Sequence, residues 1–265
     1  MKILDCENIE STYASIQNII GLKRRTLESL FTNLDLEDFY KKNPNIYSFE
    51  YAIISIIEKK YKINYNVDST AWFHATRIFK NNNFCGDILP LGMVINQIWE
   101  QLYFVAKKHI SLNNWNKFRT DFENNKSGRH SENLYNMKVN DKYHWGPFGF
   151  LIKDTILVPK EMGNWDYLGS PEIIYNICNS FKEYTKIDLF NHYMKSSYPV
   201  IIKFIDPNFK TECIGFALYY LYLNSLGESV NTGCNYCYDG NGKRVNSDKI
   251  LGIDKIDLWR TSLLS

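Results

Sequence analysis

The segment STAWFHATRIF, residues 69–79, places His74, Thr76 and Arg77 in the middle of a run of β-forming residues. If it forms a strand, its side chains alternate between two faces, so His74 and Thr76 share one face and Arg77 lies on the other. A histidine beside a threonine is either a satisfied polar pair in the core or the wall of a ligand pocket. The planar fork of an arginine suits phosphate. The chemistry that these three types together indicate is recognition of a nucleotide.

The string FHATR, followed by the turn ILPLG, resembles the first strand motif of the ADP-ribosyltransferase superfamily, in its histidine branch. The resemblance implies that His74, as a catalytic and binding residue, bonds a ribose hydroxyl of NAD, and that Thr76 supports it. Arg77 then becomes a candidate for the NAD phosphates. Ala75 stands where many relatives have glycine, and the order of elements matches loosely over residues 69–260.

The resembled family also needs a catalytic glutamate, which stabilises the positive charge that grows on the nicotinamide ribose as the glycosidic bond breaks. We choose Glu172 in YLGSPEIIYNIC, with Glu212 and Glu228 as alternatives. A structural interpretation competes with this choice. Ser170 as cap, Pro171 as first helical residue and a glutamate in the first turn make an ordinary helix start.

The stretch KYHWGPFGFLI gathers aromatic side chains around a Gly-Pro turn, and Tyr143 is the one we predict to contact the nicotinamide ring. The same cluster could instead close a core. Other enzyme classes fit less well. Cys213 has no histidine after it to serve as base, and the pair Cys234 and Cys237 lacks a second pair of zinc ligands, so we predict no metal site.

The elements that must position these residues follow from hydrophobic periodicity. We predict helices before residue 65, a strand at 69–79, a helix at about 93–110, a polar surface excursion with one short helix at 112–142, and a strand pair after residue 143. A helix from SPEIIYNIC, a strand YPVIIKFID, a helix TECIGFALYYLYLNSLG and a last strand KILGIDKIDLW complete the chain. The fold class is therefore α+β, with a mixed sheet core and flanking helices, and the resemblance makes that core ADP-ribosyltransferase-like.

We divide the chain into a helical accessory region, residues 1–65, and an α+β core, residues 66–265, which would bind NAD and carry catalysis. With 265 residues, of which 45% are hydrophobic and 23% charged, the chain is long enough for a sizeable core. No stretch reaches the roughly 18 consecutive apolar residues that span a membrane. The start MKILDCENIE becomes polar too soon for a secretory signal. We therefore expect a cytoplasmic protein without a membrane partner.

The formal net charge of +2 neither demands nor excludes a nucleic-acid partner. The resemblance implies an enzyme that consumes NAD as substrate and transfers ADP-ribose to a protein, RNA or DNA acceptor, as a toxin or defence effector with an inhibitory partner protein. The alternative function is a non-catalytic module that keeps a transferase-like core and binds a nucleotide or a protein.

Overall fold

The computed structural model describes residues 1–63, 65–82, 84 and 86–257, and it is a mixed helix and sheet protein, which confirms the predicted α+β class. The chain forms two compact units, each assembled from separate segments. Unit 1 comprises Met1–His74, Gly149–Asn164 and Lys203–Tyr238. Unit 2 comprises Ala75–Phe148, Trp165–Ile202 and Asp239–Ser265. The predicted boundary at residue 65 remains a prediction.

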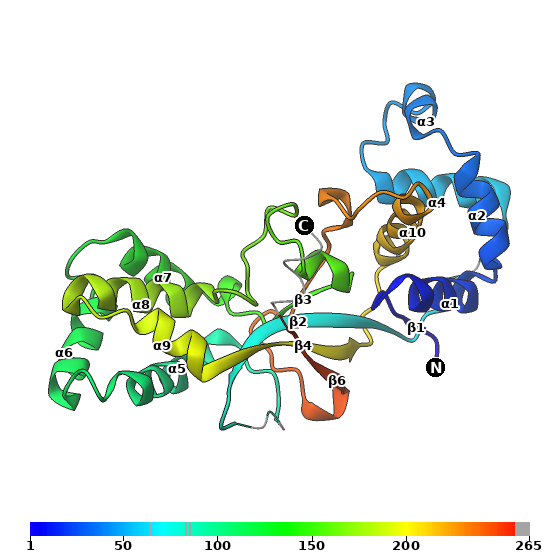
Figure 1. Ribbon diagram of the computed structural model, residues 1–265. Helices are drawn as coiled ribbons and strands as arrows, with labels where there is room; N and C mark the ends of the chain where they lie inside the picture. Colours follow the sequence, from blue (N-terminus) through cyan, green and yellow to red (C-terminus); the bar gives the residue numbers. More distant parts are fainter. Residues whose placement is uncertain (64, 83, 85, 258–265) are drawn as a thin grey trace. The chain divides into compact units, whose positions relative to one another are not determined.

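The described strands form a sheet in the order β5-β3-β2-β4-β6, with β1 paired to β2 (Figure 1). β1 runs parallel to β2 and places Ile3 opposite Ser69, whereas β3 runs antiparallel to β2 and places Phe73 opposite Phe150. The bounds are β1 Ile3–Leu4, β2 Ser69–Phe79, β3 Phe148–Phe150, β4 Ser197–Asp206, β5 Cys237–Asp239 and β6 Ile250–Lys255.

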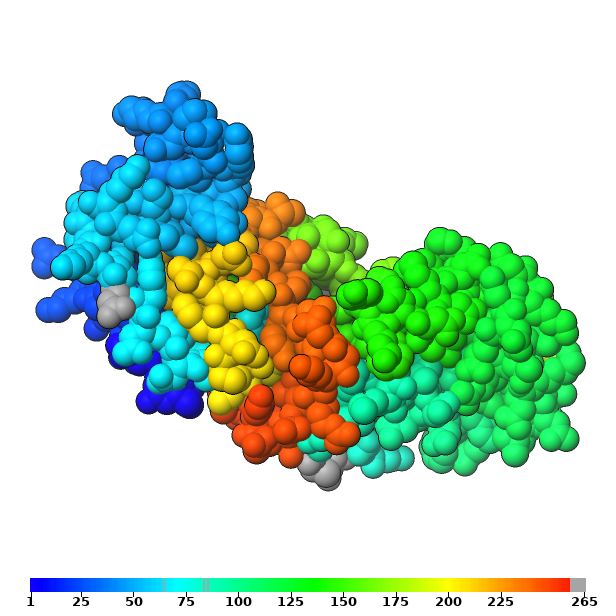
Figure 2. All heavy atoms as spheres, turned by 180° about the vertical axis from the view of Figure 1, so that it is seen from behind, coloured from blue at the N-terminus to red at the C-terminus, as the bar shows by residue number. Residues whose placement is uncertain are grey.

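Helices α1, α2 and α4 of unit 1 pack around α10, which is apolar on all sides and buried from Cys213 to Leu223 except at Phe216. In Figure 2 the cyan surface of α4 adjoins the yellow surface of the α10 segment. Close packing requires Gly215, because a Cβ there would lie 2.6 Å from the carbonyl oxygen of Glu50 on α4. The bounds are α1 Ile9–Ile20, α2 Arg24–Thr32, α3 Leu36–Lys42, α4 Phe49–Lys60 and α10 Glu212–Ser225, with 3-10 turns η2 Lys153–Ile156 and η3 Thr232–Cys234.

Unit 2 contains a helical layer that Figure 1 shows in green and yellow. Its core is aromatic: the side chains of Trp99, Trp115 and Phe122 are almost fully buried against one another. The bounds are α5 Leu91–Ala106, α6 Leu112–Glu123, α7 His130–Asn140, α8 Glu172–Thr185 and α9 Leu189–Ser196, with 3-10 turns η1 Lys142–His144 and η4 Ser247–Lys249.

Several sequence predictions are confirmed. The strand predicted at 69–79 is β2, the apolar run YPVIIKFID falls within β4, and the helix from TECIGFALYYLYLNSLG is α10. The last predicted strand corresponds to β6, although its final residues Leu258 and Trp259 lie outside the described residues. None of the helices in the described ranges combines the length and the apolar character needed to cross a membrane.

Two predictions about the middle of the chain are wrong. Residues 112–142 are two packed helices, α6 and α7, instead of a surface excursion, because their aromatic side chains face the core of unit 2. The predicted strand pair after residue 143 is the short strand β3 followed by the turn η2.

The start of α8 also differs in detail from the prediction. The N-cap is Pro171 and no side chain caps the helix, so Ser170 does not act as cap.

Candidate functional site

The polar residues in the middle of β2 are half-buried between buried apolar neighbours. His74 and Thr76 are of intermediate exposure, whereas Phe73 and Ala75 are buried. Because strand side chains alternate, Trp72 and His74 point to the same face of β2. Trp72 is 3% exposed and its indole Nε1 has no hydrogen-bond partner among the described residues. This face of β2 therefore carries a half-buried imidazole beside a buried indole N–H.

Arg77 makes structural contacts on the other face of β2. Its Nη1 donates to the Leu168 carbonyl at 2.6 Å, and its Nε donates to the Ser197 hydroxyl at 3.0 Å. Its Nη2 donates to the Ser197 carbonyl at 3.2 Å. Burial lowers the pKa of Arg77, and the accepting carbonyls replace the water that the guanidinium has lost. The guanidinium fork thus ties β2 to the start of β4, and its predicted contact with phosphate remains a prediction.

In unit 1 a chain of contacts leads from Trp72 to Glu212. The rings of Trp72 and Tyr236 stack with centroids 6.0 Å apart. The Tyr236 hydroxyl donates to one carboxylate oxygen of Glu212 at 3.1 Å, and the Tyr51 hydroxyl donates to the other at 2.7 Å. These two bonds, the one from Tyr51 first, lower the pKa of Glu212. The carboxylate is therefore ionised at neutral pH and held from both sides.

The other residues predicted for the site lie elsewhere. Glu172 belongs to unit 2, where its carboxylate forms an ion pair with the ammonium of Lys138 on α7, and its side chain is 12% exposed. Tyr143 is 82% exposed in η1. Glu228 is exposed in the segment after α10. Of the three candidate glutamates, Glu212 and Glu228 belong to the unit that contains His74, and only Glu212 is linked to the Trp72 face of β2.

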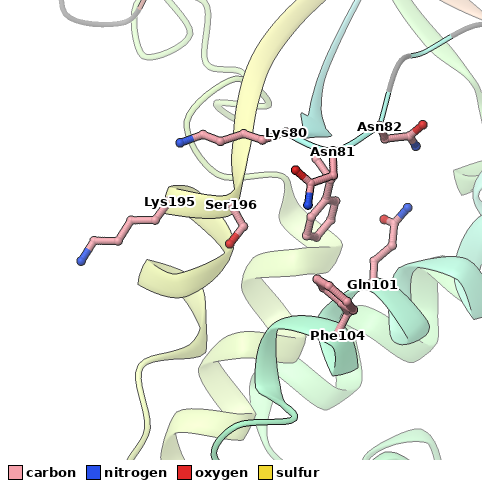
Figure 3. A pocket seen from close by; sticks show the side chains of 8 residues that line it. Lys80, Asn81, Asn82, Gln101, Phe104, Lys195 and Ser196 are labelled. Atoms are coloured by element: carbon pink, nitrogen blue, oxygen red, sulfur yellow. The ribbon is translucent and has the colours of Figure 1, made fainter.

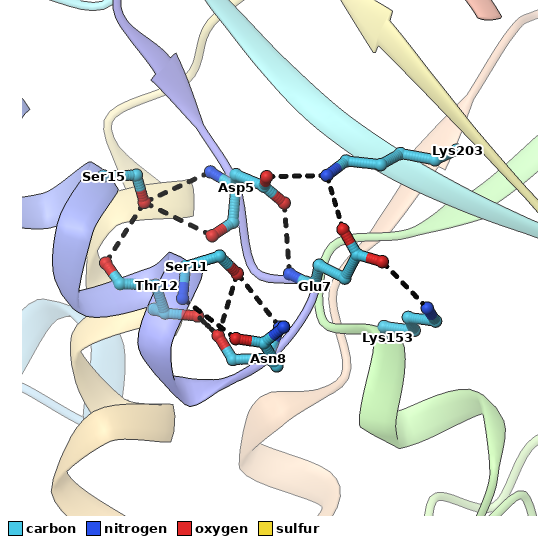
Figure 4. Close-up of polar contacts among 8 residues, drawn as sticks. All are labelled: Asp5, Glu7, Asn8, Ser11, Thr12, Ser15, Lys153 and Lys203. Carbon is cyan, nitrogen blue, oxygen red and sulfur yellow. Dashed lines mark hydrogen bonds and ion pairs between the residues drawn. The ribbon is translucent and has the colours of Figure 1, made fainter. Parts of the chain in front are cut away.

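An ion network that the sequence analysis missed joins β4 to the segment after β1 (Figure 4). The ammonium of Lys203 lies 2.6 Å from a carboxylate oxygen of Asp5 and 2.7 Å from one of Glu7. The other carboxylate oxygen of Glu7 lies 3.0 Å from the ammonium of Lys153. Lys203 and then Lys153 lower the pKa of Glu7 by hydrogen bonds. Each charge in this network has a partner, so the network is suited to fastening the chain and not to binding a ligand.

We expect Lys203→Met to destabilise the protein in a pH-dependent way. At neutral pH the loss of charged hydrogen bonds should lower the free energy of unfolding by roughly 1.5–3 kcal/mol. Because the folded-state pKa of Glu7 lies below its ordinary value of 4.5, the stability that this group contributes is present above about pH 4.5 and is lost as the pH falls through the folded-state pKa. The difference between variant and wild type should therefore shrink toward pH 3. Urea unfolding at both pH values measures it.

Lys42→Met is the matched control, because the ion pair between Lys42 and Asp38 is exposed on both sides and should contribute little. An equal loss of stability at neutral and at acid pH in Lys203→Met would show that packing, and not charge, accounts for the effect.

Unit 2 contains a groove with a volume of about 440 Å³ between the end of β2, helix α5 and the end of α9 (Figure 3). We name it the β2–α5 groove. The backbone N–H of Lys80 donates to the Ser196 carbonyl at 2.8 Å and so joins two of its walls. It is lined by aromatic, amide, hydroxyl and cationic side chains: Phe79, Lys80, Asn81, Asn82, Gln101, Phe104, Lys195 and Ser196.

Comparisons of this chain with models of protein families, with curated proteins and with solved structures find no match. Within the described ranges no group of three or more histidine, cysteine or acidic side chains is arranged to hold a metal ion.

Tyr51, Tyr236 and the groove lysines Lys80 and Lys195 are not among the residues predicted from the sequence. Of these residues, only Lys80 had a position in the sequence that could have drawn attention to it, because it follows directly after the predicted strand. The partners of Glu212 depend on contacts between residues as far as 161 positions apart.

Proposed function

We propose that the protein is an NAD-dependent ADP-ribosyltransferase with an ADP-ribosyltransferase-like core. The observation that carries this proposal is a set of contacts that begins on the face of β2 shared by Trp72 and His74. The ring of Trp72 stacks on Tyr236, and the Tyr236 hydroxyl donates to the ionised carboxylate of Glu212. This arrangement supplies a half-buried histidine and a fixed carboxylate within one unit. These are the two groups that the reaction requires of the protein.

The residues would act in distinct ways. His74 would bond a ribose hydroxyl of NAD, and Thr76 would support it two positions further along the strand. The unpartnered Nε1 of Trp72 is a buried donor that a ligand oxygen would satisfy, which removes the cost of leaving it unpaired. These groups bind and orient the substrate before the bond breaks.

Glu212 would serve the bond-breaking step. As the bond between the ribose carbon and the nicotinamide nitrogen breaks, its electron pair leaves with nicotinamide and positive charge develops on the ribose. The fixed negative charge of Glu212 would stabilise that charge. Because Tyr51 and Tyr236 hold the carboxylate in its ionised form, little reorganisation accompanies the step. The acceptor nucleophile, from a protein, RNA or DNA, then takes up the ADP-ribose and loses its proton.

A second candidate function is a binding module without turnover. Two contacts favour it. The guanidinium of Arg77 is already bonded to backbone carbonyls, and the carboxylate of Glu172 is paired with Lys138, so both residues have structural roles. A protein of this kind would bind NAD or another nucleotide and leave it intact.

We predict that the purified protein releases nicotinamide from NAD and that His74→Ala reduces NAD affinity or turnover by roughly tenfold, the effect of one lost hydrogen bond to a ligand. The melting temperature should hardly change, because His74 is half-exposed. Nicotinamide release measured by chromatography, with NAD affinity by calorimetry, tests this.

His130→Ala is the matched control, because His130 is exposed on α7 in unit 2. Binding of NAD without nicotinamide release would identify the binding module, and a protein that neither binds nor cleaves NAD would overturn the transferase proposal.

A further inference from the structure

The β2–α5 groove carries positive charge that no acidic side chain in the described part of the chain neutralises. None of its lining residues is acidic. Among the described residues no carboxylate comes within 4.0 Å of the ammonium groups of Lys80, Lys195 or Lys107. Helix α9 contains no acidic residue, and the only one in α5 is Glu100, which does not line the groove. An anion entering the groove therefore meets attraction without a competing negative charge.

An exposed aromatic ring accompanies these cations. Phe104 on α5 is 58% exposed, although the ammonium of Lys107 lies 4.0 Å from its ring centroid. Leaving a phenylalanine ring in water is unfavourable, and a planar ligand that stacks on it would remove that cost. The groove thus combines lysine side chains that could bind phosphate groups with an aromatic ring on which a nucleic-acid base could stack.

The amides add hydrogen-bonding groups that suit base edges. The side chains of Asn81 and Gln101 line the same groove as Phe104. Each carboxamide both donates and accepts, so it can pair with any of the bases.

We propose that the β2–α5 groove binds single-stranded nucleic acid, with phosphates along Lys80 and Lys195 and a base on Phe104. In Figure 3 the two lysine side chains extend out of the hollow toward the same side and do not converge on one point. That arrangement suits successive phosphates of a strand better than the single phosphate of a mononucleotide. Aromatic rings beside a cationic track are how proteins bind single strands without sequence preference. This binding does not depend on the transferase activity proposed above.

The test is fluorescence anisotropy of labelled oligothymidylate and oligouridylate with the full chain. Two neutralised phosphates predict a slope of log affinity against log salt of about −1.4, so that a roughly fourfold rise in salt weakens binding about sevenfold. Lys80→Gln with Lys195→Gln should flatten that slope toward zero. Phe104→Leu should weaken binding by about 5- to 150-fold, the usual effect of losing one stacked base.

Lys142→Gln with Lys243→Gln is the matched control, since it removes the same charge from exposed lysines of unit 2 that do not line the groove. The control should bind like wild type. Equal losses in both double variants, or an unchanged affinity in Phe104→Leu, would overturn the proposal. So would full displacement of the strand by thymidine monophosphate at equal nucleotide concentration, because that result identifies a mononucleotide site. Strand binding with no nicotinamide release would leave this inference standing while the transferase proposal fails.

Discussion

Glu212→Gln should lower the rate of nicotinamide release by about 10²–10³-fold, the usual effect of removing one electrostatic stabiliser of a transition state. The substitution keeps the size of the side chain, and its amide oxygen can still accept from Tyr51. The negative charge and one acceptor oxygen are lost, so the Tyr236 hydroxyl must turn to accept from the new amide. No predicted contact with NAD is removed, so NAD affinity should be largely retained. Single-turnover release of nicotinamide, compared with calorimetric binding of NAD, separates the two quantities.

Glu172→Gln and Glu228→Gln are the companion variants. Glu172→Gln breaks the ion pair with Lys138 and should therefore lower stability while leaving the rate intact. Glu228 is exposed, and its variant should behave like wild type. If instead Glu212→Gln is fully active and Glu172→Gln is not, the catalytic role passes to Glu172.

The pH dependence of nicotinamide release gives a further test of Glu212, because it would not shift if Glu212 had a purely structural role. The hydroxyl of Tyr51 makes the bond that contributes most to lowering the pKa of Glu212. Tyr51→Phe removes it, so the folded-state pKa of the carboxylate should rise. The acid limb of the pH–rate profile, where activity is lost as Glu212 takes up a proton, should then move to higher pH.

The choice among the three candidate glutamates shows which features of the site could be predicted from the sequence and which could not. The strand β2 was predictable because β-branched and aromatic residues crowd STAWFHATRIF, and the faces of its side chains follow from alternation. Which glutamate meets that strand depends instead on β5, whose neighbour Tyr236 stacks on Trp72. No local pattern specifies such a contact. The same holds for Lys203 and Asp5, which pair across 198 positions of sequence.

The misread segment 112–142 has a different cause. Its many asparagines give the composition of a surface loop, and composition outweighed periodicity in our interpretation. The helical signal was nevertheless present, because Trp115, Phe118 and Phe122 recur at intervals of three and four residues in α6. Ser111 also caps that helix by accepting from the backbone of Asn114. A few buried aromatic residues are enough to fix a helix whose remaining positions are polar.

This aromatic core leads to the second large effect: Phe122→Ala should destabilise unit 2 by roughly 3–5 kcal/mol. Phe122 is 1% exposed, and its ring contacts those of Tyr135 and Trp99 at centroid distances of 4.8 and 5.7 Å. The indole of Trp99 also donates to the Tyr135 hydroxyl at 2.8 Å, so the cavity would open beside a buried hydrogen bond. Equilibrium unfolding in urea, followed by near-ultraviolet circular dichroism of the aromatic cluster, measures the loss.

Leu112→Ala is the matched control on the same helix, because Leu112 is 51% exposed and its truncation should change stability by less than about 0.5 kcal/mol. The comparison isolates burial from helix propensity, since both variants place alanine in α6. If residues 112–142 were a surface excursion, both substitutions would have small and similar effects. A loss below about 1 kcal/mol in Phe122→Ala would therefore contradict the packed core of unit 2.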